Sequence, residues 1–262
     1  MNTQPDTFCW YCTHCRTALE SRTAGLACPA CSLTYPLIGD IPDLRVNLPA
    51  WIDVDTDWQN AHRLLGLSPG LTTGELVAEV FRQRGWSSNE VNDRTTQTLQ
   101  GPARLGRELD DWLAIPTTAS RGFLEVGCGG GSLLAAAAAR GRHGIGVDVS
   151  LEWLVVAQRF ITEHGGTPRL AAAMAEALPV ADASTESVVS LDVVEHVVMR
   201  AFGTLDPHVL LAEIPGEELA RFAPVKALAA RAYNRALRFR LGRVLLLFVC
   251  PLFRILACKK PA

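Results

Sequence analysis

The chain has 262 residues, of which 48% are hydrophobic and 20% are charged, so it can bury a substantial core and is not disordered by composition. Its formal net charge of −2 gives no molecule-wide attraction to nucleic acid or to a membrane surface. The charge is unevenly spread, because residues 221–262 hold ten Lys and Arg and no acid. We expect any electrostatic binding surface to lie in that segment.

The ends of the chain carry no recognisable targeting signal. The first ten residues, MNTQPDTFCW, lack the basic patch and apolar run of a signal peptide. The apolar stretch at 244–258 is shorter than the roughly 20 residues of a membrane helix and contains Pro251 and Arg254. We therefore predict a cytoplasmic protein, in which the eight cysteines are thiols or metal ligands rather than disulfides.

Two Cys-x-x-Cys pairs lie close together near the amino end. Cys12 and Cys15 form the first pair, Cys28 and Cys31 form the second, and twelve residues separate them. Each pair can form a tight turn that points both sulfurs at one ion, and four thiolates in a tetrahedron suit zinc. Metal binding would supply the folding energy that so short a segment lacks. Because Cys9 also forms such a pair with Cys12, the spacing alone leaves the ligand set open.

The stretch YCTHCRTALE…LACPACSLTYPLIGDIPDL, within residues 10–44, resembles the zinc ribbon of the small activator subunit of tRNA and protein methyltransferases. That pattern reads C-P-x-C-x-x-x-L, later C-x-x-C, and then Y-P-x-x-x-G-I-P; here Thr13 replaces the usual proline. The resemblance implies a structural zinc site with a role in substrate presentation or partner docking. The ligands that it implies are Cys12, Cys15, Cys28 and Cys31.

The middle of the chain is less informative. Residues 76–84 (LVAEVFRQR) have helical spacing, and residues 102–113 (PARLGRELDDWL) predict a second helix that ends before Pro116. A helix in this position either covers a cofactor pocket or simply packs against the core. We divide the chain into a zinc ribbon at 1–48, a linker and helical cap at 49–118, and a Rossmann-like domain at 119–262.

The stretch FLEVGCGGGSLL, residues 123–134, predicts a strand, a glycine-rich turn and a helix, which is the start of a Rossmann-like unit. The turn lacks the Gly-Lys-Ser/Thr of a triphosphate loop, and glycines at 127, 129 and 131 do not give the G-x-G-x-x-G of dinucleotide folds. Glu125 lies two residues before the turn, where a carboxylate would repel a pyrophosphate. It suits a ligand that carries an ammonium group.

The run E-V-G-C-G-G-G resembles the first motif of class I S-adenosylmethionine-dependent methyltransferases. Downstream, the strand GIGVD that ends at Asp148, the run AEALP, and the run DASTESVVSLDVVEH that ends at His196 resemble further motifs of a broad methyltransferase subgroup. The resemblance spans about residues 122–197. It implies an α/β fold with a Rossmann-like parallel sheet, helices on both faces, and S-adenosyl-L-methionine as cofactor.

Residue roles follow from the match to that family. Glu125 is expected to orient the methionine amino group, and Asp148 to accept both ribose hydroxyls. Glu195 and His196 are the base candidates for catalysis. Met174 departs from the pattern, which usually has an aspartate on the adenine amine. The expected cofactor-binding residues are Glu125, Gly127, Cys128, Gly129, Gly131, Asp148, Ala175 and Glu176.

The pattern breaks after His196. The P-G-G turn and the fifth strand of the family are not recognisable, so the sheet is expected to lack a strand and to expose an edge. Residues 206–214 read as a helix or a strand; a basic helix at 217–240 and strands at 244–249 and 252–258 follow. A strand at 209–214 or a homodimer would compensate for the loss.

The expected function is methyl transfer from S-adenosylmethionine to a small-molecule acceptor, in which the protein mainly aligns acceptor and methyl group. One alternative is methylation of a ribosomal RNA base, because a zinc ribbon ahead of this domain resembles the arrangement in bacterial large-subunit ribosomal RNA guanine methyltransferases. A basic carboxyl-terminal segment would then bind phosphates. Another alternative is a truncated, non-catalytic binding protein, and a fourth is a lipid-like substrate reached at a membrane surface.

Overall fold

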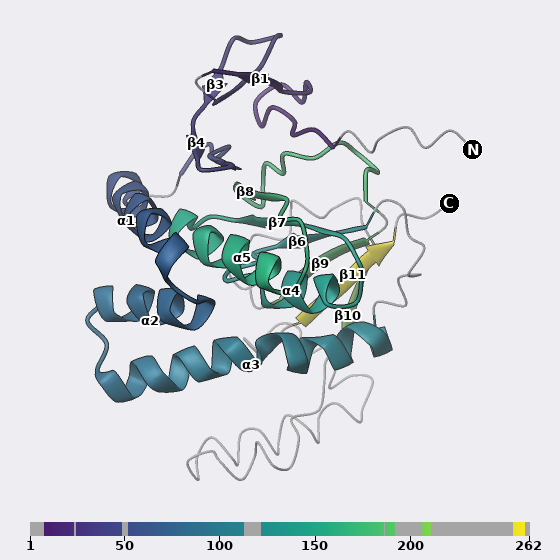
Figure 1. Ribbon diagram of the computed structural model, residues 1–262. Helices are drawn as coiled ribbons and strands as arrows, with labels where there is room; N and C mark the ends of the chain where they lie inside the picture. Colours follow the sequence, from purple (N-terminus) through teal and green to yellow (C-terminus); the bar gives the residue numbers. More distant parts are fainter. Residues whose placement is uncertain are drawn as a thin grey trace.

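The computed structural model describes residues 8–23, 25–48, 52–112, 122–185, 187–191, 206–210 and 254–259. A six-stranded sheet in the order β10-β11-β9-β6-β7-β8 organises them (Figure 1). Its strands are β6 (Phe123–Val126), β7 (Gly144–Asp148), β8 (Leu170–Ala172), β9 (Ser187–Leu191), β10 (Asp206–Leu210) and β11 (Arg254–Lys259). The four strands from β9 to β8 are parallel; α4 (Ser132–Ala138) connects β6 to β7, and α5 (Leu151–Glu163) connects β7 to β8. The predicted Rossmann-like α/β fold is therefore confirmed.

The far edge of the sheet departs from a fully parallel arrangement. β11 pairs antiparallel with β9, and β10 pairs antiparallel with β11. Within the described residues no parallel strand lies between β9 and β11, as the break in the sequence pattern predicts. Residues 206–214 were expected to form a helix or a strand, and Asp206–Leu210 form a strand. The strand expected at 252–258 is found at Arg254–Lys259. The helix expected at 217–240 and the strand expected at 244–249 lie outside the described residues.

Five helices are described, and the first two begin with a local capping signal. Their bounds are α1 (Val54–Leu67), α2 (Thr73–Gln83), α3 (Ser88–Trp112), α4 (Ser132–Ala138) and α5 (Leu151–Glu163). The Asp53 side chain accepts from the Thr56 amide at the start of α1, and Thr72 and Glu75 form a capping box at the start of α2. A short 3₁₀ turn, Ser68–Gly70, joins the two.

Helix α3 is longer than the sequence predicted. We expected a helix to begin at Pro102, but it begins at Ser88 and runs through that proline. A proline inside a helix has no N–H for the carbonyl four residues earlier, here Thr98. In this structure the Ser132 hydroxyl donates to the Thr98 carbonyl oxygen at 3.5 Å. Contact with the start of α4 thus replaces the missing helical bond.

Alternating residues of the strands pack on two different sides of the sheet. One side packs against the helices: Phe123 of β6 and Leu170 of β8 share a core with residues of α4 and α5 such as Leu134 and Leu154. The described helices α1 to α5 lie on this side of the sheet (Figure 1), so the helices expected on both faces are described on one face only. The opposite side, which includes Leu124, packs against the amino-terminal segment.

The amino-terminal segment is built from short strands. β1 (Glu20–Arg22), β2 (Gly25–Ala27) and β3 (Thr34–Tyr35) form one antiparallel sheet, and β4 (Leu37–Ile38) pairs with β5 (Ile41–Pro42). Figure 1 shows this segment beyond β8, at the edge of the large sheet. The domain boundary expected at 118 lies outside the described residues. No helix in the described ranges is both long and apolar enough to cross a membrane.

Candidate functional site

The glycine-rich turn after β6 requires its glycines. Gly127, Gly129 and Gly131 have φ angles of 75°, 48° and 77°, in the left-handed region that side chains disfavour. A Cβ on Gly131 would also lie 2.8 Å from the Cβ of Ala157 in α5. The amides of Gly127 and Cys128 donate to the Val147 carbonyl of β7. The turn is therefore fixed tightly between the ends of β6 and β7.

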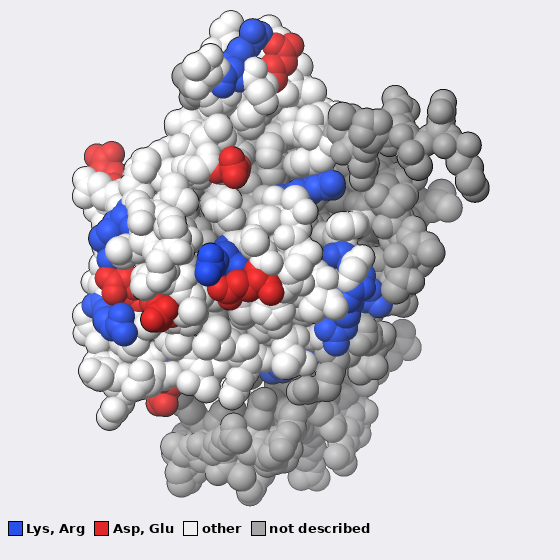
Figure 2. Space-filling model, viewed as in Figure 1, with Lys and Arg blue, Asp and Glu red and all other residues white. Residues whose placement is uncertain are grey.

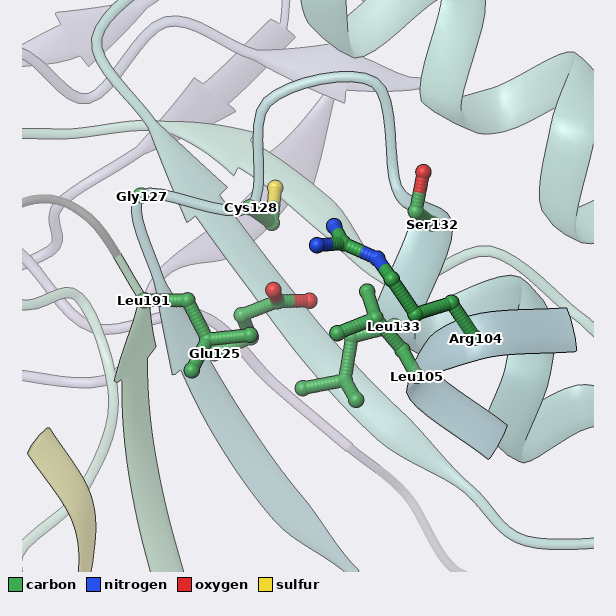
Figure 3. Close-up of a pocket in the computed structure, with 8 residues that line it drawn as sticks. All are labelled: Arg104, Leu105, Glu125, Gly127, Cys128, Ser132, Leu133 and Leu191. Atoms are coloured by element: carbon green, nitrogen blue, oxygen red, sulfur yellow. The ribbon is translucent and has the colours of Figure 1, made fainter. Parts of the chain in front are cut away.

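A cavity of about 130 Å³ lies at the carboxyl ends of β6 and β9, beside this turn. Ligands of open α/β sheets bind at this end of the strands. The lining residues are Arg104, Leu105, Glu125, Gly127, Cys128, Ser132, Leu133 and Leu191 (Figure 3). Three of the residues expected to bind the cofactor are in this set. The other five residues come from α3, from the start of α4 and from the end of β9.

Glu125 is the unusual group in the cavity wall. Only 3% of the residue is exposed, and its Oε2 atom is buried without a hydrogen-bond partner. Burial and the nearby charge of Asp148 raise the pKa of this carboxyl well above its usual value. A buried carboxylate without a partner is costly, so a donor or a cation brought by a ligand would stabilise it.

Asp148, at the end of β7, holds the glycine turn. Its Oδ2 accepts from the Gly129 amide at 2.8 Å, and its Oδ1 accepts from the Ser150 amide at 2.9 Å. Burial raises the pKa of Asp148, although these two amides lower it. Asp148 is not among the residues that line the described cavity. Each carboxylate oxygen still has a second lone pair, so the side chain can accept further hydrogen bonds.

The start of α5 is not capped by the side chain of the preceding Ser150. Ser150 occupies the N-cap position, but its side chain makes no capping hydrogen bond. Asp57 of α1 takes this role, because its Oδ2 accepts from the Leu151 amide at 3.1 Å. Leu151 is the first residue of the helix. No sequence pattern pointed to Asp57, which lies 94 residues before Leu151.

The other expected site residues are placed differently. Ala175 and Glu176 lie on a turn after β8, where Glu176 is exposed, and neither lines the described cavity. Glu195 and His196 lie outside the described residues. Cys128 lines the cavity as a buried thiol whose pKa is raised, first by burial, so it is not a reactive thiolate.

Arg104 is the charged cavity residue that sequence reasoning missed. It extends from α3 toward the glycine turn, and in Figure 3 its guanidinium points toward Cys128 and Glu125. The sequence gave no motif at this position. The only signal was the apolar face of α3, which we had expected to cover a pocket or merely to pack.

The four paired cysteines come together in the amino-terminal segment. The sulfurs of Cys12, Cys15, Cys28 and Cys31 all lie within 4.8 Å of one another. Three of the separations are 3.3, 3.7 and 3.8 Å. A zinc–sulfur bond of about 2.3 Å gives a sulfur–sulfur edge of about 3.8 Å in a tetrahedron. Cys9 is exposed and lies outside the cluster.

Comparison with known proteins gives a family match for part of the chain. Residues 124–215 match the sequence model of the methyltransferase domain family, from the second residue of β6 to beyond β10. The matched segment has the sequence pattern of a methyltransferase domain. No curated protein sequence gives a significant match to the chain.

Two solved structures show remote similarity to the chain. Phosphoethanolamine N-methyltransferase 2 of Haemonchus contortus, in complex with S-adenosyl-L-methionine, is 15% identical with a TM-score of 0.31; the match covers 57% of this chain and 52% of that protein. The E. coli protein YjhP is also 15% identical with a TM-score of 0.31, and the match covers 62% of this chain and 92% of that protein. This chain thus spans about half the length of the Haemonchus enzyme. Similarity at this level says nothing about substrate.

Proposed function

We propose that the chain binds S-adenosyl-L-methionine at the glycine turn and transfers its methyl group to a small-molecule acceptor. The observation that carries the proposal is the buried, unpartnered carboxylate oxygen of Glu125 in the wall of a cavity beside that turn. The match of residues 124–215 to the methyltransferase domain family supports the same ligand. The methionine ammonium group would supply the charge partner that Glu125 lacks.

The cavity offers partners for both ends of an amino acid. Glu125 suits the ammonium group, and Arg104, which lines the same cavity, suits the carboxylate. Asp148 would take the ribose hydroxyls with its free lone pairs, and Ala175 and Glu176 would lie near the adenine. S-adenosylmethionine supplies an activated methyl group, so the residues of the chain mainly have to hold it in line with the acceptor. Glu195 or His196 would serve as base for an acceptor that carries a proton.

The cysteine cluster fits a structural zinc ion. Four thiolates at tetrahedral spacing form a closed set, which leaves no open position for a reacting group. We propose Cys12, Cys15, Cys28 and Cys31 as the ligands and a structural role for the ion.

The face drawn in Figure 2 carries charges of both signs. Acidic and basic side chains alternate over its left and centre, and a group of basic side chains lies at its right. The basic residues that favoured an RNA acceptor belong to 221–262, most of which lie outside the described residues.

Calorimetric titration with S-adenosyl-L-methionine tests the proposal directly. We expect binding of one ligand per chain, with weaker binding of an Asp148→Asn variant because a ribose acceptor loses its charge. Absence of both heat and thermal shift in the wild type would instead favour a non-catalytic methyltransferase-like protein. Retention of the protein on immobilised RNA at moderate salt would favour RNA over a small molecule as the acceptor.

A further inference from the structure

The amino-terminal segment, residues 8–48, shares a buried core with the large sheet. On the side of the sheet opposite the helices, residues from β6, β7 and β8 contact residues of this segment. The members from the sheet are Leu124, Val126, Ile145, Val147, Ala171 and Ala173, and those from the segment include Cys12, Leu19, Cys28, Tyr35 and Leu44. Two of the clustered cysteines are therefore part of the core that supports the ligand-binding strands.

Backbone hydrogen bonds also join the segment to the sheet. The Leu44 amide donates to the Ala172 carbonyl at 2.8 Å, next to a parallel bridge between Asp43 and Ala172. This contact extends the sheet beyond β8. At the other end of the segment, the Tyr11 amide donates to the Pro179 carbonyl at 2.9 Å.

Arg16, which directly follows the cluster residue Cys15, holds the loop after β8. Its guanidinium donates to the carbonyl oxygens of Leu178 and Val180 and forms an ion pair with Asp182 at 2.9 Å. The loop that begins at Ala175 is the one expected to lie near the adenine. The turn that carries the first two cysteines is thus tied to a loop of the proposed ligand site.

Arg45 makes a second and more deeply buried connection. Its side chain is 0% exposed, and it binds Asp43 in bidentate fashion at 2.8 and 2.7 Å. One of its terminal nitrogens, Nη1, also donates to Asp57 at 2.7 Å and to the Val149 carbonyl at 2.8 Å. Trp58 completes the group by donating to Asp43 at 2.8 Å.

These contacts lead directly to the glycine turn. Val149 follows Asp148, whose carboxylate holds the Gly129 amide. Asp57 in turn accepts from the Leu151 amide, so the segment 148–151 is held both by Arg45 and by the partner of Arg45. A buried ion cluster is weak evidence for stability, because its desolvation cost offsets its attraction. Fixing one geometry of this segment is a role that the cluster can fill.

We propose that the amino-terminal segment positions the ligand site, with Arg45 as the positioning residue beneath Asp148 and Arg16 as a second anchor on the loop after β8. The proposal rests on the proposed function, since the ligand used to test it is S-adenosyl-L-methionine. Arg45 and Arg16 touch no ligand themselves; they act through Asp148 and through the loop after β8.

The test compares Arg45→Lys and Arg45→Met in the full chain by ligand titration and by amide hydrogen exchange. Lysine keeps the charge but cannot bind two carboxylates and a carbonyl in one plane. We expect affinity for S-adenosyl-L-methionine to fall about 3-fold or more in the lysine variant and about 10-fold or more in the methionine variant. We also expect faster exchange at the Gly129 and Ser150 amides, with unchanged exchange in α2.

Arg16→Ala is tested against a matched control. Arg63 of α1 also makes surface contacts, an ion pair with Glu79 and a hydrogen bond to Gln83, and its side-chain exposure of 36% is close to the 46% of Arg16. We expect Arg16→Ala to weaken ligand binding by about 3-fold or more, and Arg63→Ala to leave it within 2-fold.

The outcomes separate this inference from the proposed function. If the wild type binds no S-adenosyl-L-methionine but Arg45→Lys speeds exchange at Gly129 and Ser150, positioning stands and the proposed function fails. If the wild type binds and both Arg45→Lys and Arg16→Ala match it in affinity and exchange, the positioning role is overturned. Should Arg45→Met fail to fold, Arg45→Lys alone decides.

Discussion

Burial of the Glu125 carboxyl without a partner lowers the stability of the fold, and the same carboxyl is the proposed contact for the ligand. Replacing Glu125 should therefore affect stability and ligand affinity in different ways. Charge-assisted hydrogen bonds contribute about 1.5–3 kcal/mol, so Glu125→Gln is expected to weaken S-adenosyl-L-methionine binding about 10-fold or more. The pKa of Glu125 is raised on folding, so its neutral form favours the folded state, and that advantage is lost as pH rises through the raised pKa. The stability of Glu125→Gln relative to wild type should therefore increase with pH, by about 1–3 kcal/mol at most.

Thermal unfolding at a series of pH values checks this expectation, with Glu163→Gln as control. Glu163 lies at the far end of α5, and its pKa is lowered. Burial, the largest single effect, raises this pKa, but the hydrogen bonds from Thr73 and Arg159 together outweigh it. Its contribution to stability has the opposite sign of pH dependence, so Glu163→Gln should lose stability relative to wild type as pH rises. A pH-independent difference for Glu125→Gln would contradict a buried, unpartnered carboxyl.

Arg104 is expected to select the carboxylate of the ligand. An Arg104→Met variant keeps much of the apolar stem and loses the fork of donors. It should bind S-adenosyl-L-methionine about 10-fold more weakly, yet bind the decarboxylated analogue as well as the wild type does. Calorimetric titration of both ligands measures this difference. Equal losses for the two ligands would show that Arg104 acts on packing or on general charge.

The contact between α3 and α4 closes one side of the cavity and depends on the absence of a side chain. A Cβ on Gly101 would lie 2.5 Å from Ser132 Oγ and 2.8 Å from Ser132 Cβ, closer than packed atoms allow. Gly101→Ala is therefore expected to destabilise the protein by about 1–3 kcal/mol, although alanine has the better helix propensity. Adding Ser132→Gly should recover part of that loss, as measured by denaturant unfolding of both single variants and the double variant. If the stability losses of the two single variants simply add in the double variant, the contact between residues 101 and 132 is not the source of the strain.

Helix α3 shows what the sequence could and could not predict at the level of elements. The start of α3 could have been predicted, because Ser87 and Glu90 have the spacing of a capping box in the sequence. In the structure they exchange the hydrogen bonds of that motif. The continuation of α3 through Pro102 could not have been predicted. The carbonyl that the proline leaves without a helical donor accepts a hydrogen bond from a hydroxyl of another helix. Propensity rules see only the local chain, and here a tertiary contact outweighs them.

The strands around the glycine turn were easier to predict. β6 and β7 have the predicted bounds, because an apolar run followed by required glycines leaves few local alternatives. The ion cluster of Arg45, Asp43 and Asp57 was not predictable. Its members are surface-type residues in the sequence, and they become buried only when the amino-terminal segment meets the segment after β7.

At the scale of the whole molecule, the recognised motifs cover the sheet only up to the break after His196. Of the four parallel strands, the sequence placed β6 and β7, and β9 lies within the run that ends at His196. Antiparallel β11, which pairs directly with β9, lies beyond the last recognised motif. Sequence motifs consist of residues that bind a ligand. The far edge of a sheet is determined by side-chain packing, which many different sequences can achieve, so no motif marks it. The recognised motifs concern the cofactor site, so the acceptor is the part of the proposed function that they do not predict.

The cysteine cluster should stabilise the whole molecule, because its residues share a core with the sheet. We expect one zinc ion per chain and a lower unfolding temperature after chelation, with S-adenosyl-L-methionine binding weakened in parallel. Cys28→Ser should lose the ion, since one of the four close sulfurs is removed, whereas Cys9→Ser, at an exposed cysteine outside the cluster, should keep it. Metal content by elemental analysis and thermal unfolding of both variants measure these effects. A Cys28→Ser variant that retained one ion and the wild-type unfolding temperature would show that the four sulfurs are not a metal site, and the segment would then depend on its shared core alone.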